Sequence, residues 1–186
     1  MRPRLPVIGV MGSGSQGHPD RAIPLGEWLA TLPVHLLTGG GAGVMREVCR
    51  AFAQSTQREG LVIGILPAER QGSASPMPGY PNQWVDVAIY THLHLLGEQG
   101  QAPLSRNHIN VLSSDLIIAL PGGRGTSSEV ALALDYRRPV VAFVGSRGDI
   151  PGLSDAVPTA RSLDGVKDFV RSTLNGQLPG TEPQLA

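Results

Sequence analysis

The chain has 186 residues, 41% of them hydrophobic, which is enough to bury the core of one domain, and it shows no internal repeat or domain boundary. Its fifteen basic residues balance fifteen acidic ones, so the basic excess that nucleic-acid-binding proteins use against phosphate is missing, and we expect no nucleic-acid partner. The lone Cys49 excludes an internal disulfide, and no metal-ligand spacing is present, so we expect no structural metal.

Short β-rich runs alternate with helical patterns from the start of the chain, which is typical of a parallel sheet covered by helices. The first apolar run, Leu5–Met11, is too short for a signal-peptide core or a membrane span, so we expect a cytoplasmic protein without a membrane partner. In chain order we expect a strand at Val7–Met11, a helix within Pro19–Leu32 with Pro24 near its start, a strand at Val34–Leu37, a helix from Val44 to about Glu59 ended by Gly60, and a strand at Leu61–Leu66.

A long stretch without periodicity, residues 67–84, interrupts this alternation. It is rich in Pro, Gly and Ser, and a structureless loop of that length in a compact domain is usually a functional lid or a mobile segment. In chain order we then expect a strand at Val85–Ile89, a polar patch at Gly97–Pro103, a helix from about Ser105 to Ser113, a strand at Leu116–Leu120, a helix to about Tyr136, a strand at Val140–Val144 and a helix capped by Asp164 that runs through Leu174.

This order of elements predicts a single α/β domain of Rossmann-like type over residues 1–186. Its sheet should be open and mainly parallel, with helices flanking both faces. The Pro-, Gly- and Gln-containing residues 176–186 should form a frayed tail.

Three glycine-rich turns each follow an expected strand and open a helix. Free backbone N–H groups and the helix dipole favour an anion at such a point, and glycine lets the backbone approach a ligand closely. In a parallel sheet these turns gather at the carboxyl ends of the strands, where ligands bind. The sequence therefore predicts a site for a phosphorylated, nucleotide-like ligand.

The first turn, Gly12–Gly17, matches the G-x-G-x-x-G pattern of dinucleotide-binding proteins. The acidic residue that would bind the ribose after the second strand is missing, because Thr38–Gly39 stands there, and we expect no NAD. A phosphate or base contact is the better interpretation for Gly12 and Ser13. The second turn, Thr38–Met45, holds three consecutive glycines, whose entropic cost favours close approach by a ligand over a purely structural turn.

The third turn, Pro121–Glu129, reads Pro-Gly-Gly-Arg-Gly-Thr-Ser-Ser-Glu. Thr126 and Glu129 match the T-x-x-E capping box, so Glu129 has a structural as well as a catalytic interpretation, and both can hold together. Arg124 lies between glycines and could close over a phosphate or remain solvated. Arg106 stands near an expected helix start, where its charge opposes the helix dipole, and binding of an anion explains it better than a structural role.

Pro-Gly-Gly-x-Gly-Thr-x-x-Glu resembles the hallmark of a Rossmann-like superfamily. That superfamily includes the "lonely guy" cytokinin-activating hydrolases, formerly called lysine decarboxylases, and the molybdenum cofactor carrier proteins. The resemblance spans Val7 to about Val144, and Gly39–Met45 is similar to the family's G-G-G-x-x-G-x-Met, with Thr38 in place of its first glycine. It implies a homo-oligomer, a dimer or a tetramer.

The resemblance implies two alternative functions. As a nucleoside 5′-monophosphate phosphoribohydrolase, the chain would use Glu129 and Arg106 as catalytic residues while water attacks the anomeric carbon of the ribose. However, Ser105–Asn110 and the strand ending Gly64–Pro67 are more similar to the carrier branch, whose cleft holds and shields the phosphorylated pterin of the molybdenum cofactor. We therefore favour a carrier or storage protein for molybdopterin, the resemblance implying molybdoenzymes as recipients.

The cofactor-binding residues expected on these grounds come from all three turns and from the helix before the third strand-to-helix turn. They are Gly12, Ser13, Gly39, Gly40, Gly41, Gly43, Met45, Arg106, Asn107, Pro121, Gly122, Gly123, Arg124, Gly125, Thr126 and Glu129.

Overall fold

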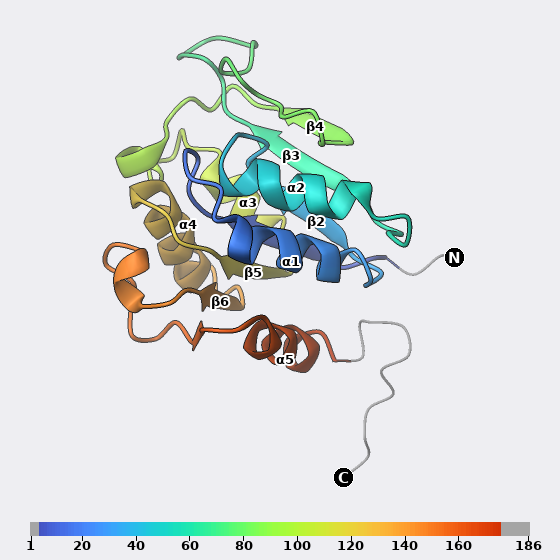
Figure 1. Ribbon diagram of the computed structural model, residues 1–186. Coiled ribbons are helices and arrows are strands. Elements are labelled where there is room, and N and C mark those ends of the chain that lie inside the picture. The colour runs from blue at the N-terminus through green and yellow to red at the C-terminus, as the bar shows by residue number, and fades with distance from the viewer. Residues whose placement is uncertain (1–3, 176–186) are drawn as a thin grey trace.

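The computed structural model describes residues 4–175 as one sheet with helices on both sides (Figure 1). The elements in chain order are β1 (Val7–Met11), α1 (Pro19–Leu29), β2 (His35–Thr38), α2 (Val44–Gln54), β3 (Val62–Leu66), β4 (Val87–Tyr90), η1 (Gly97–Gln99), α3 (Asn107–Leu112), β5 (Leu116–Ala119), α4 (Arg124–Asp135), β6 (Val140–Phe143), η2 (Arg147–Asp149), β7 (Thr159–Ala160) and α5 (Leu163–Thr173). The seven strands are all parallel, in the order β4-β3-β2-β1-β5-β6-β7. The predicted α/β class with an open parallel sheet is confirmed.

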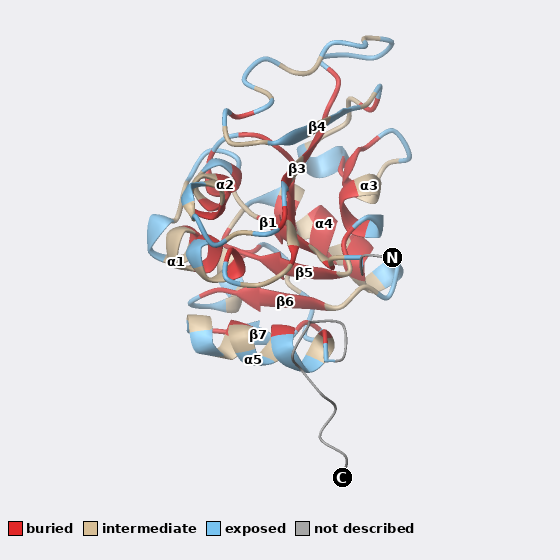
Figure 2. Cartoon of the chain, turned by 90° about the vertical axis from the view of Figure 1, so that its right-hand side faces the viewer, coloured by how far each residue is buried: buried red, intermediate tan, exposed pale blue. Residues whose placement is uncertain are grey.

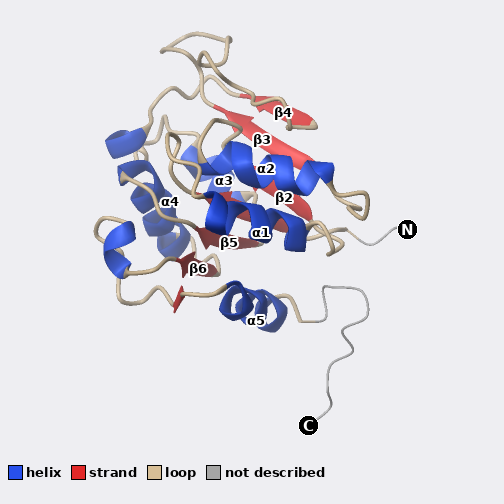
Figure 3. Ribbon diagram, in the orientation of Figure 1, coloured by secondary structure: helices blue, strands red, loops and turns tan. Residues whose placement is uncertain are grey.

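Helices α1, α2 and α5 cover one face of the sheet, and α3 and α4 cover the other (Figures 1 and 3). Side chains of a strand alternate between the two faces, so Ile8 and Val10 of β1 join the core under α1 and α2, whereas Met11 joins the core under α4. The inner strands are therefore buried on both sides, as parallel strands usually are, and only the edge strand β4 is largely exposed (Figure 2). In the described part of the chain, no helix has both the length and the apolar character that crossing a membrane requires.

The boundaries of the first two helices differ from the predicted ones. Helix α1 begins at Pro19, after His18 in a left-handed conformation, so Pro24 lies inside the helix rather than near its start. Helix α2 ends at Gln54, and Gly60 is not its C-terminal stop. Gly60 is needed for a different reason, because the backbone of Val34 lies against its Cα and leaves no room for a side chain.

The last part of the chain also departs from expectation. Strand β7 was not predicted, because two residues are too few to show a pattern. The cap of α5 is Ser162, whose Oγ accepts a hydrogen bond from the Gly165 N–H at 3.3 Å, and Asp164 instead lies in the first turn. The predicted frayed tail, residues 176–186, lies outside the described residues.

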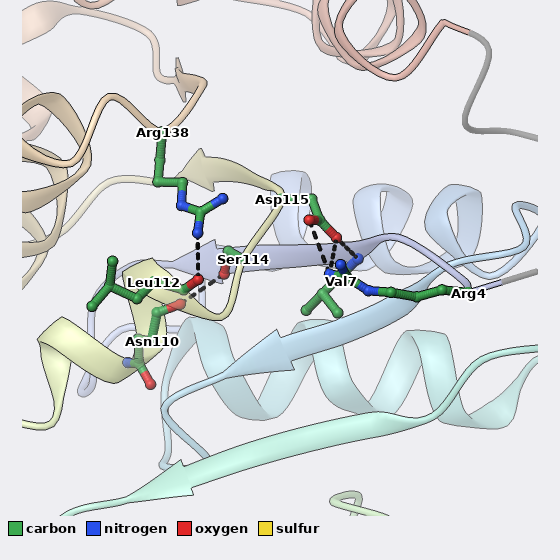
Figure 4. Close-up of polar contacts among 7 residues, drawn as sticks. All are labelled: Arg4, Val7, Asn110, Leu112, Ser114, Asp115 and Arg138. Carbon is green, nitrogen blue, oxygen red and sulfur yellow. Dashed lines mark hydrogen bonds and ion pairs between the residues drawn. The ribbon is translucent and has the colours of Figure 1, made fainter.

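The amino ends of β1 and β5 are joined by polar contacts at the edge of the sheet away from the glycine turns (Figure 4). Asp115 accepts hydrogen bonds from the Val7 N–H at 2.8 Å and from the Arg4 guanidinium at 2.8 and 3.0 Å. The end of α3 is held by Ser114, whose hydroxyl donates to the Asn110 carbonyl at 2.8 Å, and by Arg138, which donates to the Leu112 carbonyl at 2.7 Å (Figure 4). These bonds fix α3 against the sheet and so fix the side chains that α3 directs toward the opposite edge.

Candidate functional site

A cavity of about 390 Å³ lies where the glycine turns after β1, β2 and β5 meet. Main-chain hydrogen bonds connect the three turns: Ser13 N–H donates to the Pro121 carbonyl at 3.1 Å, and Val44 N–H donates to the Ser13 carbonyl at 2.9 Å. Ten of the residues predicted from sequence line this cavity: Gly12, Ser13, Gly39, Met45, Arg106, Asn107, Gly123, Gly125, Thr126 and Glu129. Residues from four separate parts of the sequence, 12–13, 39–45, 106–107 and 123–129, are thus brought to one place by the parallel topology.

Helix α4 directs its N-terminus at this cavity. Its N-cap is Gly123, in an extended conformation, and the first intrahelical bond runs from the Ser127 N–H to the Gly123 carbonyl at 3.1 Å. The N–H groups of the preceding turn have no acceptor within the helix, and Gly123, Gly125 and Thr126 line the cavity there. The positive end of the helix dipole and these free donors make the cavity favourable for an anion.

The predicted capping box at Thr126 and Glu129 is wrong. Because the extended Gly123 serves as the cap, the helix begins two residues before Thr126, and both side chains lie within its first two turns. Glu129 does not return to the helix start; its Oε1 accepts a hydrogen bond from the Asn110 amide at 2.9 Å. Glu129 is 7% exposed, and burial raises the pKa of its carboxyl above the ordinary value, although the Arg106 charge and the Asn110 hydrogen bond oppose that rise.

Arg106 is the one basic side chain that lines the cavity. It is only 4% exposed, and its Nε and Nη1 have no hydrogen-bond partner among the described residues. It forms no ion pair with any carboxylate in residues 4–175. The guanidinium lies against the bare Cα of Gly39, where a β-carbon would come within 2.6 Å of the Arg106 Cζ. The absence of a side chain at Gly39 is therefore what gives the buried cation its place.

The other predicted glycines of the second turn, Gly40, Gly41 and Gly43, do not line the cavity but form the turn behind it. Gly40 and Gly43 have positive φ angles of 73° and 61°, and the Gly40 N–H donates to the Thr38 hydroxyl at 3.0 Å. Thr38, which replaces the first glycine of the family motif, thus stabilises the turn. Gly41 packs against the ring of Tyr80, because a β-carbon placed on Gly41 would lie 2.7 Å from the nearest atoms of that ring.

Three predicted residues of the third turn lie outside the first cavity. Pro121 and Gly122 line a neighbouring cavity of about 630 Å³, which also contains Ser13 and Gly123. Arg124 points to solvent and pairs with Glu98 of η1, with 2.8 Å between Nε and Oε1 and both side chains 72% exposed. Such an exposed ion pair contributes little stability and leaves Arg124 free to reorient.

Sequence reasoning missed the lining residues that come from the two polar stretches. Tyr80 belongs to residues 67–84, Gly97 is the first residue of η1, and Leu96 directly precedes it. Asn82 fixes the loop that carries Tyr80, since its N–H donates to the Gly40 carbonyl at 2.7 Å and its amide to the Gly41 carbonyl at 2.9 Å. The length of the loop was the available signal, but it could not indicate which side chain enters the cavity.

Comparison with known proteins agrees with this geometry. A family model described as the SLOG cluster4 family matches residues 5–163. The chain belongs to the SLOG cluster4 family. This confirms the predicted Rossmann-like superfamily.

Two solved structures and one further protein are similar to this SLOG cluster4 chain. The molybdenum cofactor binding protein from the phototrophic bacterium Rippkaea orientalis is 36% identical, with a TM-score of 0.70 over 92% of this chain and 98% of that one. The Moco carrier protein from Chlamydomonas reinhardtii is 32% identical, with a TM-score of 0.69 over the same shares of the two chains, 92% and 98%. An uncharacterized protein of Archaeoglobus fulgidus is 35% identical over 142 residues, 75% of this chain and 81% of that one.

Proposed function

We propose that this protein binds the phosphorylated pterin of the molybdenum cofactor and acts as its carrier. The observation that supports this most strongly is Arg106, a buried guanidinium that forms no ion pair and leaves two nitrogens without hydrogen-bond partners among the described residues, beside the free N–H groups of α4. A buried charge is costly to leave uncompensated, so a cavity that contains one is suited to an anionic ligand. The similarity to two molybdenum cofactor binding and carrier proteins indicates which anion to test first.

The residues of the cavity divide into a polar and an apolar part. Arg106 and the first turn of α4 supply donors for a phosphate, whereas Met11, Met45 and Tyr80 supply apolar surface for a flat ring. The cofactor itself supplies redox chemistry in the enzyme that receives it. The carrier has only to bind the phosphate, cover the ring and exclude oxidants.

Copurification tests this proposal directly. The protein is produced in a host that makes the cofactor, purified without oxygen, and assayed for molybdenum by mass spectrometry and for oxidised pterin by fluorescence. We expect both in the wild type and much less of each in Arg106→Ala. Arg46→Ala is the matched control, because Arg46 lies on α2 with its side chain 57% exposed and does not line the cavity. Wild-type protein without molybdenum or pterin would refute the carrier function.

Phosphoribohydrolase activity is the second candidate, because Glu129 and Arg106 line the same cavity. In that case a Glu129→Gln substitution keeps the hydrogen bond from Asn110 but removes the carboxylate that the sugar transition state needs, and turnover should fall about 100-fold or more. Nucleoside 5′-monophosphates are incubated with both proteins, and free base and ribose 5-phosphate are measured. Turnover by the wild type that the substitution abolishes would replace the carrier function by the hydrolase.

We further propose that the carrier is a cytoplasmic homo-oligomer that delivers its cofactor to molybdoenzymes. Self-association is supported by the edge strand β4, on which Val87, Ile89 and Tyr90 are 39%, 42% and 59% exposed. Light scattering after size-exclusion chromatography measures the mass. A monomer at micromolar concentration would contradict the proposal.

A further inference from the structure

The second cavity adjoins the first and shares part of its wall. Ser13, Ser15 and Gly123 line both cavities, so the glycine at the start of α4 stands on the border between them. At about 630 Å³, the second cavity has the size of a small-molecule site. A phosphate held at the start of α4 would therefore lie next to a second space that a simple phosphomonoester does not fill.

A basic side chain, Arg21 of α1, lines this second cavity. Its guanidinium is 5.4 Å from the centre of the Phe143 ring, its Nη1 pairs with Asp20 at 2.7 Å, and its buried Nε has no hydrogen-bond partner among the described residues. The side chain is thus held in place while 22% of it remains exposed. It offers a fixed cation to an anionic group in the cavity.

An acidic residue, Asp149, also lines the cavity, and hydrogen bonds from Ser146 and Gly145 together with the charge of Arg21 lower the pKa of its carboxyl. One carboxylate oxygen accepts from the Gly145 and Ser146 N–H groups at 2.8 and 3.1 Å, and the other accepts from the Ser146 hydroxyl at 3.0 Å. The Asp149 carbonyl accepts from the Gly122 N–H at 3.0 Å. Asp149 therefore serves to hold the third glycine turn against η2, and Arg21 and the imidazole of His18 are the basic side chains that line the cavity.

We propose that the second cavity binds the nucleotide half of a pyrophosphate-linked ligand, so that the preferred cargo is a dinucleotide form of the cofactor. The pyrophosphate crosses the border at Gly123, with its first phosphate at the start of α4 and its second near Arg21. The pterin half stays in the first cavity with Arg106. This assignment rests on the proposed carrier function and specifies which form of the cofactor is carried.

The test compares two ligands under anaerobic conditions: molybdopterin, a phosphomonoester, and molybdopterin guanine dinucleotide. Wild-type protein should bind the dinucleotide at least about tenfold more tightly, the effect of one hydrogen-bonded ion pair. Arg21→Met keeps an apolar contact with Phe143 and should abolish that difference without weakening the monoester. His18→Asn, which tolerates the left-handed backbone, should reduce the difference, and Arg106→Met should weaken both ligands.

The outcomes separate the two proposals. Equal binding of both ligands by the wild type, or an equal loss for both in Arg21→Met, overturns the assignment of the second cavity and leaves the carrier function standing. Failure of the wild type to bind either ligand refutes the carrier function and the assignment together. Thermal unfolding of each variant confirms that it is folded before its affinity is compared.

Discussion

Replacing Arg106 with alanine should weaken binding of the molybdenum cofactor by about 1.5–3 kcal/mol, the range for hydrogen bonds to charged groups. That range corresponds to an increase of about 10- to 150-fold in Kd. Two guanidinium nitrogens, Nε and Nη1, lack a protein acceptor in the described structure, so the variant loses no internal hydrogen bond of those atoms. Because the Arg106 charge opposes the rise in the pKa of Glu129, the fall in the free energy of unfolding should be larger above the folded-state pKa of Glu129 than below about pH 4.3.

The assay is an anaerobic titration followed by pterin fluorescence, with thermal unfolding measured in parallel. A Gly39→Ala substitution provides a second perturbation of the same group, because its β-carbon displaces the guanidinium without removing it. Each substitution alone should weaken binding, and the double variant should lose little more than Arg106→Ala, since both act through one side chain. Unchanged affinity in Arg106→Ala, or losses that add in the double variant, would refute the reasoning.

Three further predictions concern stability. Burial raises the pKa of Glu129 in the folded state, so the contribution of Glu129 to the free energy of unfolding is greatest below about pH 4.3, the usual pKa of glutamate, and is lost as pH rises through the folded-state pKa. The difference in the free energy of unfolding between the wild type and Glu129→Gln should therefore change with pH in urea titrations, and parallel pH profiles would contradict it. Asp115→Ala leaves the Val7 N–H without its acceptor and should lower the free energy of unfolding by about 1–2 kcal/mol. Arg4→Ala, which removes a side chain that is 74% exposed, should lower it by less than about 1 kcal/mol. Equal losses would show that the ion pair matters more than the hydrogen bond to the Val7 backbone. Gly60→Ala places a β-carbon on a neighbouring backbone carbonyl and should destabilise the fold by about 2 kcal/mol or more, so an unchanged melting temperature would disprove that close approach.

The central strands and the glycine turns could be predicted from sequence because their signals are local. A strand buried on both faces must be continuously apolar, as Leu116–Ala119 is, and a turn that opens a helix toward a ligand needs glycine, as Pro121–Gly125 shows. Helix ends were predicted less well. The start of α4 depends on the extended backbone of Gly123, and that conformation cannot be distinguished in sequence from a cap at Thr126.

The sequence by itself determined the fold class, the superfamily and ten of the residues that line the first cavity, because each of these depends on composition, period or motif. Only the tertiary structure decided how those residues are used. Arg106 lies in the cavity because β1, β2 and β5 are neighbours and Gly39 leaves room for it, and Glu129 faces Asn110 because α3 packs beside α4. Tyr80 and Arg21 reach the two cavities across long separations in sequence, and no local pattern encodes contacts that depend on how distant segments pack together.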